Sequence, residues 1–452
     1  MLSFLARGRV FLLAGLVCMA GLVSPVGAAE DLAQKAAPAS VLDSGDIAWM
    51  LLASALVMLM TPGLAFFYGG LVRKKNILSI MMQCFMILCI VSLQWIFCGY
   101  SLAFGPDVGG VIGNLDWLGL KGVGMAPGAY APHIPHRLFA IYQMMFAVIT
   151  PALICGAFAE RMRFSAFCIF SLLWSTLVYA PVAHWVWGAG GFLGTMGGWG
   201  TVDFAGGIVV HVNAGMAALA AVLVMGKRHG FPHAISPPHN LPFAVLGAAL
   251  LWFGWYGFNA GSALGANALA VNAFMATHAA GAVAGLVWCL LDWLKFGKPT
   301  TLGMITGAVA GLAAVTPASG FVELSGAVWI GVLAGIVCWL SVTAMKAKFN
   351  YDDSLDAFGV HGVGGFLGSV AVGLWATQTA NPAGVNGLFY GHAAQFWIQL
   401  KACTIVAAYS FVVSWLLFKL VDHIIGLRVT HDEESIGLDL SQHREAGYTV
   451  ID

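Results

Sequence analysis

Long apolar stretches alternate along the chain with short connectors rich in glycine, proline and asparagine. An α-helix needs about 20 apolar residues to cross the hydrocarbon core of a bilayer. Eleven stretches of about that length run over 47–69, 77–104, 138–159, 164–187, 203–225, 241–262, 267–294, 301–318, 325–345, 356–377 and 395–420. The pattern therefore predicts an all-α polytopic membrane protein with eleven transmembrane helices.

Basic residues are concentrated in every second connector. Those after odd-numbered stretches are Arg73, Lys74, Lys75, Arg161, Arg163, Lys227, Arg228, Lys295, Lys298, Lys346, Lys348, Arg428 and Arg444. Connectors after even-numbered stretches hold only Lys121 and Arg137, while Lys401 and Lys419 lie inside the eleventh stretch. Because cytoplasmic loops carry the excess of Lys and Arg, this distribution predicts an N-terminus outside and a C-terminus in the cytoplasm.

The first 29 residues have the pattern of a cleavable signal peptide. Arg7 and Arg9 form a basic region, 11–23 is apolar, and the small residues of 26–29 suit cleavage. The alternative is an uncleaved first helix. A cleaved signal also places the mature N-terminus outside, in agreement with the basic residues.

Composition agrees with a membrane location. Only 9% of the 452 residues are charged, against about 25% in soluble domains. The 20 basic and 20 acidic side chains leave no net charge for nucleic acid binding. The nine cysteines all lie in apolar runs, without the Cys/His spacing of a zinc site. The sequence also lacks HExxH, GxSxG and P-loop motifs, so an enzymatic function has no support.

One short motif occurs twice. DFAGGIVVH places Asp203 eight residues before His211, and DSLDAFGVH places Asp353 eight residues before His361. The two copies begin the fifth and tenth stretches, so the helices that carry them run in opposite directions. Such inverted repeats build a substrate site at the membrane midplane between their halves. The sequence therefore predicts a 5+5 inverted repeat.

Ionisable side chains inside membrane spans are candidates for function, and His211 and His361 lead them. The repeat predicts that they face each other, sharing one N–H···N bond. Desolvation and mutual repulsion favour the neutral forms, which leave ring edges for a small polar solute. The alternatives are histidines that only pack, and a membrane enzyme that uses the pair as metal ligands. No carboxylate or third histidine has suitable spacing for such a metal site.

Asp203 has two compatible interpretations. It caps its helix by accepting the following N–H groups, and a carboxylate in that place also supplies negative potential to a nearby cation. Asp353 is interpreted as a cap facing the cytoplasm.

Aromatic residues gather at the outer ends of the stretches. Trp255, Phe258 and Ser262 end the sixth stretch, Trp187 ends the fourth, and Phe146 lies in the outer half of the third. Such rings form either an interfacial belt or a cage for a small cation, held by ring faces and a hydroxyl acceptor. Residue types alone leave both interpretations open.

Seven ordered segments resemble the ammonium transporter (Amt/Mep/Rh) family, of the bacterial Amt type. They are TPGLAFFYGGLVRKKN (61–76), GAFAERMRFSA (156–166), AHWVWGAGG (183–191), DFAGGIVVHVNAG (203–215), GWYGFNAGSA (254–263), VTPASG (315–320) and DAFGVHGVGG (356–365). The resemblance covers almost the whole chain after the signal. It implies ammonium or ammonia transport across the bacterial cytoplasmic membrane by a homotrimer, with one pore per subunit and no cofactor.

The resemblance also implies roles for residues at the outer mouth. Phe146, Trp187 and Ser262 match the family's outer ammonium site, and Phe146 with Phe258 matches the stacked pair that closes the pore. This favours the cage over the belt. One departure is Tyr142, one turn before Phe146, where phenylalanine is common, because its phenol changes the polarity of the mouth.

Deeper in the pore, Asp203 matches the family's buried aspartate, and His211 with His361 match the twin histidines of the lumen. A bare cation crosses an apolar lumen only at great cost. Ammonium is therefore expected to lose a proton and pass as ammonia, whereas potassium has no proton to lose. The sequence leaves open whether the proton follows by a separate route or stays outside.

The resemblance divides the chain into the eleven-helix domain 30–427 and a polar cytoplasmic tail, 428–452. In the family, a PII-type signalling protein plugs the pores at this tail. The alternatives are a solvated end without a partner and, for the whole protein, an ammonium sensor with little flux.

Overall fold

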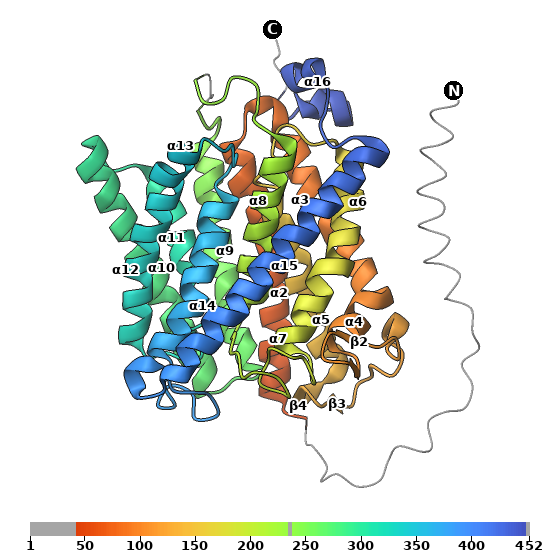
Figure 1. Cartoon of the computed structure of the whole chain (residues 1–452), viewed down its shortest axis with the longest axis vertical. Coiled ribbons are helices and arrows are strands. Elements are labelled where there is room, and N and C mark those ends of the chain that lie inside the picture. The colour runs from red at the N-terminus through yellow and green to blue at the C-terminus, as the bar shows by residue number, and fades with distance from the viewer. Residues whose placement is uncertain (1–41, 234–236, 449–452) are drawn as a thin grey trace.

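The computed structural model describes residues 42–233 and 237–448 and folds them mainly into helices (Figure 1). The predicted signal, 1–29, lies outside the described residues. The α-helices are α2 (Ser44–Leu71), α3 (Ile77–Gln94), α4 (Tyr100–Phe104), α5 (His136–Ile154), α6 (Phe164–Trp174), α7 (Ala180–Trp187), α8 (Asn213–Met225), α9 (Leu241–Ala260), α10 (Ala268–Phe296), α11 (Thr301–Val315), α12 (Leu324–Leu340), α13 (Lys346–Phe349), α14 (Val363–Trp375), α15 (Ala393–Ile425) and α16 (His431–Ile436).

Several long helices are continuous through a π-helical turn, so that one membrane-length helix carries two or three labels. These turns are η2 (Trp95–Gly99), η4 (Ser175–Tyr179), η5 (Gly207–Val212), η7 (Ser341–Met345), η8 (Phe358–Gly362) and, in the tail, η10 (Asp439–His443). Short 3₁₀ turns are η1 (Lys74–Asn76), η3 (Leu118–Leu120), η6 (Gly261–Ala263) and η9 (Leu388–Tyr390). Single π turns of this kind are frequent at functional sites.

Ten helices in the described ranges are long and apolar enough to cross a membrane. They lie at ten of the eleven predicted stretches. The eighth stretch forms α11, an apolar helix of 15 residues, which is only about 22 Å long at 1.5 Å per residue. The sequence therefore predicted the positions of the helices well, but α11 falls short of a full span.

Two predicted stretches end three or more residues earlier than expected. The third was expected to reach residue 159, but α5 ends at Ile154, because Glu160 adopts a left-handed backbone with φ of 75° and the preceding residues form turns. The eighth was expected to reach 318, but α11 ends at Val315, two residues before Pro317. Both turns are buried, since Glu160 is 4% exposed and Thr316 and Ser319 are 0% exposed.

Side-chain caps fix where four of the helices begin. Asp43, Asn240, Asn267 and Thr300 each accept a hydrogen bond from a backbone N–H in the first turn of α2, α9, α10 and α11. Such residues satisfy donors that a helix N-terminus leaves unpaired. The polar residues between the apolar stretches thus set the helix starts.

The helices repeat in an inverted 5+5 arrangement, as the sequence predicted. Counted by the eleven predicted stretches, the helices of the fourth and ninth both contain a π turn (η4 and η7), and those of the fifth and tenth both begin with one (η5 and η8). The two halves touch at glycines, since a Cβ added to Gly215 would lie 2.1 Å from Cα of Gly362. Any side chain at Gly215 would separate the halves.

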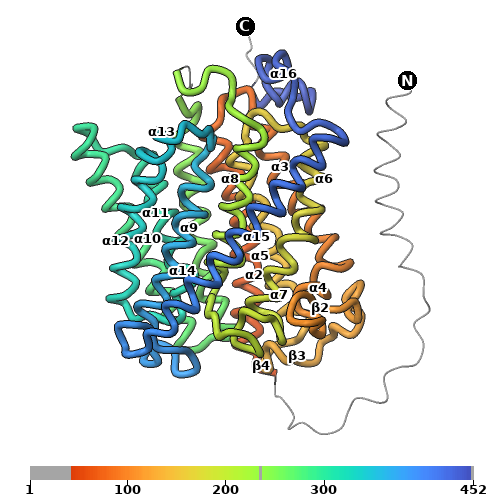
Figure 2. Tube along the Cα trace, viewed as in Figure 1, coloured from red at the N-terminus to blue at the C-terminus, as the bar shows by residue number. Residues whose placement is uncertain are grey.

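The two ends of the bundle differ (Figures 1 and 2). One end, here the hairpin end, carries the antiparallel pairs β1 (Asp107–Val108) with β2 (Ile112–Gly113) and β3 (Pro127–Gly128) with β4 (Ala131–Pro135). The other, here the tail end, carries α13 and α16. Helix α15 runs obliquely across the bundle and packs against α8 and α14.

Candidate functional site

His211 and His361 meet at the centre of the bundle. His211 lies in η5 and His361 in η8, and the ring centroids are 5.2 Å apart with an interplanar angle of 16°. His211 is 1% exposed and His361 is 4% exposed. Close backbone packing holds them together, because a Cβ on Gly365 would lie 2.6 Å from Cβ of His211.

The N–H···N bond expected between the two imidazoles does not form. Neither ring nitrogen of His211 has a hydrogen-bond partner among the described residues, and Nδ1 of His361 has none either. The rings are nearly parallel, whereas N–H groups and nitrogen lone pairs lie in the ring plane. The prediction of this bond was therefore wrong, and these buried nitrogens are left without a partner among the described residues.

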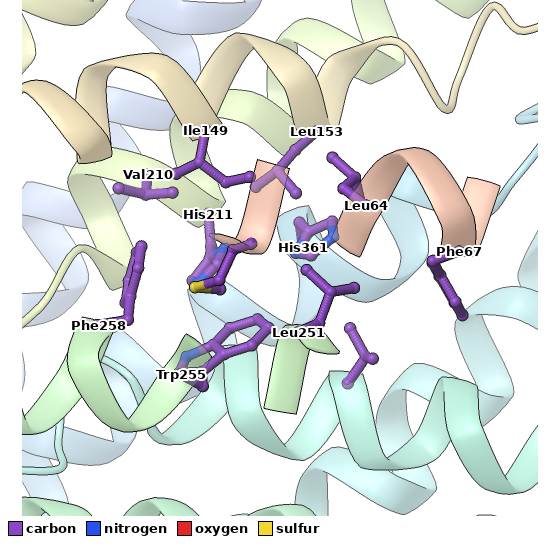
Figure 3. A pocket seen from close by; sticks show the side chains of 12 residues that line it. Leu64, Phe67, Ile149, Leu153, Val210, His211, Leu251, Trp255, Phe258 and His361 are labelled. Carbon is purple, nitrogen blue, oxygen red and sulfur yellow. The ribbon is translucent and has the colours of Figure 1, made fainter. Parts of the chain in front are cut away.

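A narrow lumen surrounds the histidine pair (Figure 3). Its volume is about 10 Å³, roughly the space for a single water-sized molecule. Apart from the histidines, the lining side chains are apolar or aromatic: Met60, Leu64, Phe67, Ile149, Leu153, Val210, Leu251, Trp255, Phe258 and Val309. Such a wall provides almost nothing to replace the hydration shell of an ion.

Two phenylalanines close the lumen toward the hairpin end. Phe146 of α5 and Phe258 of α9 stack with centroids 4.2 Å apart, and both are 1% exposed. Trp187, at the end of α7, meets Phe146 edge to face at 6.0 Å. The structure thus brings together rings that are far apart in sequence.

Ser262 lies just beyond these rings, in η6. Its hydroxyl donates to the carbonyl oxygen of Phe258 at 3.0 Å, which leaves its lone pairs as acceptors. The Tyr142 hydroxyl is 3.2 Å from Ser262 Oγ and 3.0 and 2.8 Å from the carbonyl oxygens of Gly257 and Phe258. The phenol noted in the sequence therefore braces the end of α9.

Asp203 is a backbone cap. Its two carboxylate oxygens accept from the N–H groups of Gly206, Gly207, Ile208 and Val209, at 2.6 to 3.1 Å. Its own carbonyl oxygen accepts from Trp187 Nε1 at 2.8 Å. Asp203 thus links the outer rings to the turn that carries His211. It is not one of the residues that line the lumen.

Asp353 has the matching position in the second half, with fewer partners. It accepts from the N–H groups of Ala357 and Phe358 at 3.1 and 2.8 Å, as the cap interpretation expected. Burial, followed by the neighbouring Asp356, raises the pKa of Asp353 to about 6.

Trp255, which the sequence grouped with the outer aromatic residues, lies deeper and lines the lumen beside His211. Its ring stacks on His211 at 5.6 Å, and its Nε1 donates to Thr316 Oγ1 at 2.8 Å. The spacing in the sequence could have predicted this position, because Trp255 precedes Phe258 by three residues and so shares its helix face.

The tail end carries an ion-pair network that the sequence reasoning also missed. Arg228 binds Asp352 at 2.7 Å and Glu160 at 3.3 Å, and Arg73 binds Glu160 at 3.0 Å. Burial alone would raise the pKa of Glu160, but Arg73 and Arg228 lower it. These partners are far apart in sequence, so no local sequence pattern predicts the network.

The tail packs onto this network. Glu434 of α16, 1% exposed, accepts from Arg428 Nη2 at 2.8 Å and from the backbone N–H of His229 at 3.0 Å. Leu438 N–H donates to the Asn76 side chain at 2.8 Å. The start of the tail is therefore part of the folded body.

The metal-ligand alternative for the histidine pair lacks a third ligand. Within 42–233 and 237–448, His, Cys, Asp and Glu form no group of three that could hold a metal ion. The pair thus offers ring edges in an apolar lumen, which suits a small neutral molecule.

Comparisons with known proteins identify the family. A family model for the Ammonium Transporter Family matches residues 48–448. An ammonium transporter of Bacillus subtilis is 51% identical over 407 residues, 90% of this chain and 99% of that protein. The ammonium transporter Amt1 of Archaeoglobus fulgidus is 49% identical over 408 residues, 90% of this chain and 100% of that protein. The crystal structure of Saccharomyces cerevisiae Mep2 matches with a TM-score of 0.80 at 38% identity, over 87% of this chain and 89% of that chain. The chain is therefore a multi-pass membrane protein that belongs to the ammonium transporter family.

Proposed function

We propose that this protein binds ammonium at its hairpin end, removes a proton, and conducts ammonia past His211 and His361. The single observation that carries the proposal is the lumen of about 10 Å³, in which the unpartnered nitrogens of the histidines lie among apolar side chains. Ammonia can donate to and accept from ring nitrogens without carrying charge into that space.

The outer rings form the proposed ammonium site. Phe146 and Trp187 offer ring faces, and the lone pairs of Ser262 Oγ offer an acceptor. Asp203 acts from below by holding four N–H groups, not by touching the cation. The stacked pair Phe146 and Phe258 acts as the gate. Potassium has no proton to release, so it is rejected at the gate.

The proposed orientation places the hairpin end outside the bacterial cytoplasmic membrane and the tail end in the cytoplasm. The excess of basic residues in the tail-end connectors supports it. In this orientation the N-terminus is outside and ammonium enters at the aromatic mouth.

A homotrimer would explain an exposed polar pair within the membrane region. His278 lies in α10 and is exposed, and its Nδ1 meets the Tyr256 hydroxyl at 2.8 Å. Polar side chains facing lipid are costly, so we expect a neighbouring subunit to cover them. The oligomer mass in detergent, measured by light scattering, tests this, and a monomer would contradict it.

The folded start of the tail is the proposed docking place for a PII-type protein. Glu434 and Leu438 fix it against the connectors at the pore exit. A co-purified PII protein should be lost on deletion of residues 428–452. Retention of the complex would contradict a role for the tail.

The test of the transport proposal is ammonium-evoked current in reconstituted membranes, with potassium as the comparison ion. We expect His211→Ala combined with His361→Ala to lose ammonium transport or potassium exclusion. The matched control is His392→Ala, which changes an exposed histidine outside the lumen. Wild-type current from the double variant, with potassium still excluded, would refute the role of the pair.

A further inference from the structure

The lumen opens at the tail end into a second space, here the inner cavity, of about 290 Å³. Phe67, Val309 and His361 line both spaces, so the two meet at His361. Arg228 and Asp356, from the connectors, also line the inner cavity. A molecule that passes His361 therefore enters a wider and more polar space.

Asp292 in α10 lines this cavity and is only 4% exposed. Its carboxylate accepts hydrogen bonds from the Thr300 hydroxyl and from Trp339 Nε1, the latter at 2.8 Å. Both donors are neutral, and none of the ion pairs among the described residues includes Asp292. About two of its four acceptor positions are unused.

The other charges that line the cavity are already matched. Arg228 binds Asp352 and Glu160 through its guanidinium nitrogens. Asp356 binds Lys346 Nζ at 2.6 Å. Asp292 therefore differs from the other charged residues of this wall, because it is a buried carboxylate without an ion pair among the described residues, an arrangement that is costly unless a positive charge is supplied.

A second observation concerns the entrance of the same cavity. His361, a residue 4% exposed, lines both the lumen and the inner cavity. Its Nδ1 has no hydrogen-bond partner among the described residues. A histidine with an unpartnered ring nitrogen thus lies at the entrance of the cavity, and a carboxylate without an ion pair lies in its wall.

We propose that Asp292 forms an inner ammonium site, at which the cation is held on the tail side of the pore. This inference rests on the proposed function. Ammonia that passes His361 takes a proton from hydronium and leaves water behind, and the resulting cation donates N–H groups to the free lone pairs of Asp292. The same site accepts ammonium from the tail side. It therefore sets the affinity for outward movement, as Ser262 sets it for inward movement.

The experiment measures initial rates of ¹⁵N-ammonium uptake in right-side-out and inside-out membrane vesicles, after subtraction of vesicles without the protein. Asp292→Asn keeps the size of the side chain and one acceptor but removes the charge. We expect the half-saturating ammonium concentration to rise about tenfold in inside-out vesicles, the difference between a charged and a neutral acceptor. It should change less than twofold in right-side-out vesicles.

Two controls separate charge from structure. Trp339→Phe removes a neutral donor from Asp292 and keeps the carboxylate, so it should change the half-saturating ammonium concentration in inside-out vesicles less than twofold. Ser262→Ala should change the half-saturating concentration only in right-side-out vesicles. If Trp339→Phe mimics Asp292→Asn, Asp292 is only a structural link and the proposal fails.

A second pair of variants covers the case in which Asp292→Asn does not fold. Thr343 lines the cavity four residues after Trp339. Thr343→Lys brings a tethered ammonium group toward Asp292 and should raise the half-saturating ammonium concentration in inside-out vesicles about tenfold. The neutral Thr343→Gln should not raise it. Equal values for both would overturn the inner site. Wild-type vesicles without saturable uptake in either orientation would instead refute the transport proposal itself.

Discussion

Asp203→Asn is the change that most directly tests how the pore is held. The carboxylate of Asp203 is not in contact with the lumen, yet its four N–H partners form the start of the turn that carries His211. Removing one oxygen should therefore damage the fold and the pore together. The symmetry-related Asp353 offers a matched control within the same chain.

The magnitude follows from counting acceptors. Each oxygen of Asp203 accepts two N–H groups, so an amide nitrogen in place of one oxygen leaves two buried donors unsatisfied. An orphaned buried donor costs about 1–3 kcal/mol, which gives a loss of about 2–6 kcal/mol in the free energy of unfolding. Each oxygen of Asp353 accepts one N–H group, so Asp353→Asn should cost about 1–3 kcal/mol by the same principle.

The assay is thermal unfolding of the purified variants in detergent, together with ammonium-evoked current after reconstitution. We expect Asp203→Asn to unfold at the lower temperature of the two and to lose at least about tenfold in current, because small displacements of a positioned group have large effects on rate. An unfolding temperature equal to that of wild type would refute the acceptor count. Equal losses for both aspartates would refute the asymmetry between the halves.

Three further predictions concern other parts of the site. Tyr142→Phe removes the hydroxyl that braces Ser262 and the end of α9. Because about 0.7 kcal/mol of hydrogen bonding is lost, the half-saturating ammonium concentration for inward current should rise about threefold. An unchanged concentration would show that the phenol is not coupled to the outer site. Gly215→Ala places a methyl group 2.1 Å from Cα of Gly362 and should destabilise the protein by about 3 kcal/mol or more in thermal unfolding, whereas Gly124→Ala, with open space around its Cβ position, is the control. Burial alone would raise the pKa of Glu160, but Arg73 and Arg228 hold it below its usual 4.5. The ion pairs of Glu160 therefore add stability that is present above pH 4.5 and is lost as the pH falls through the lowered pKa. The difference in unfolding temperature between wild type and Glu160→Gln should shrink from pH 7 to pH 4, and a constant difference would contradict this.

Apolar length predicted most of the fold, because a membrane helix is specified locally. It failed at the ends of α5 and α11, where turn geometry at Glu160 and Pro317 decides the boundary. The histidine pair was predictable because a repeat in sequence becomes a symmetry in space. The orientation of its rings was not, since it depends on the approach of Gly215 to Gly362 across the two halves.

Long-range contacts account for what the sequence could not reveal at the site. Glu160 meets Arg228 only through the tertiary fold, and Asp292 looks in sequence like an ordinary acidic residue near a helix end. The outer aromatic residues are a third case. Residue types left open whether Phe146 and Trp187 form a belt or a cage, and the family resemblance, not local chemistry, favoured the cage.

The departures from the repeat matter as much as the repeat itself. Symmetry accounts for His211 and His361, which are placed alike in the two halves. A symmetric pore has no inside and outside, however, so direction must come from unmatched features. Toward the hairpin end the lumen is closed by Phe146 and Phe258, whereas toward the tail end it opens into a cavity of about 290 Å³ with an unmatched carboxylate at Asp292. Under the proposed function, such a pore binds the cation differently from its two sides, and we expect ammonium affinities measured from the two faces to respond to different residues.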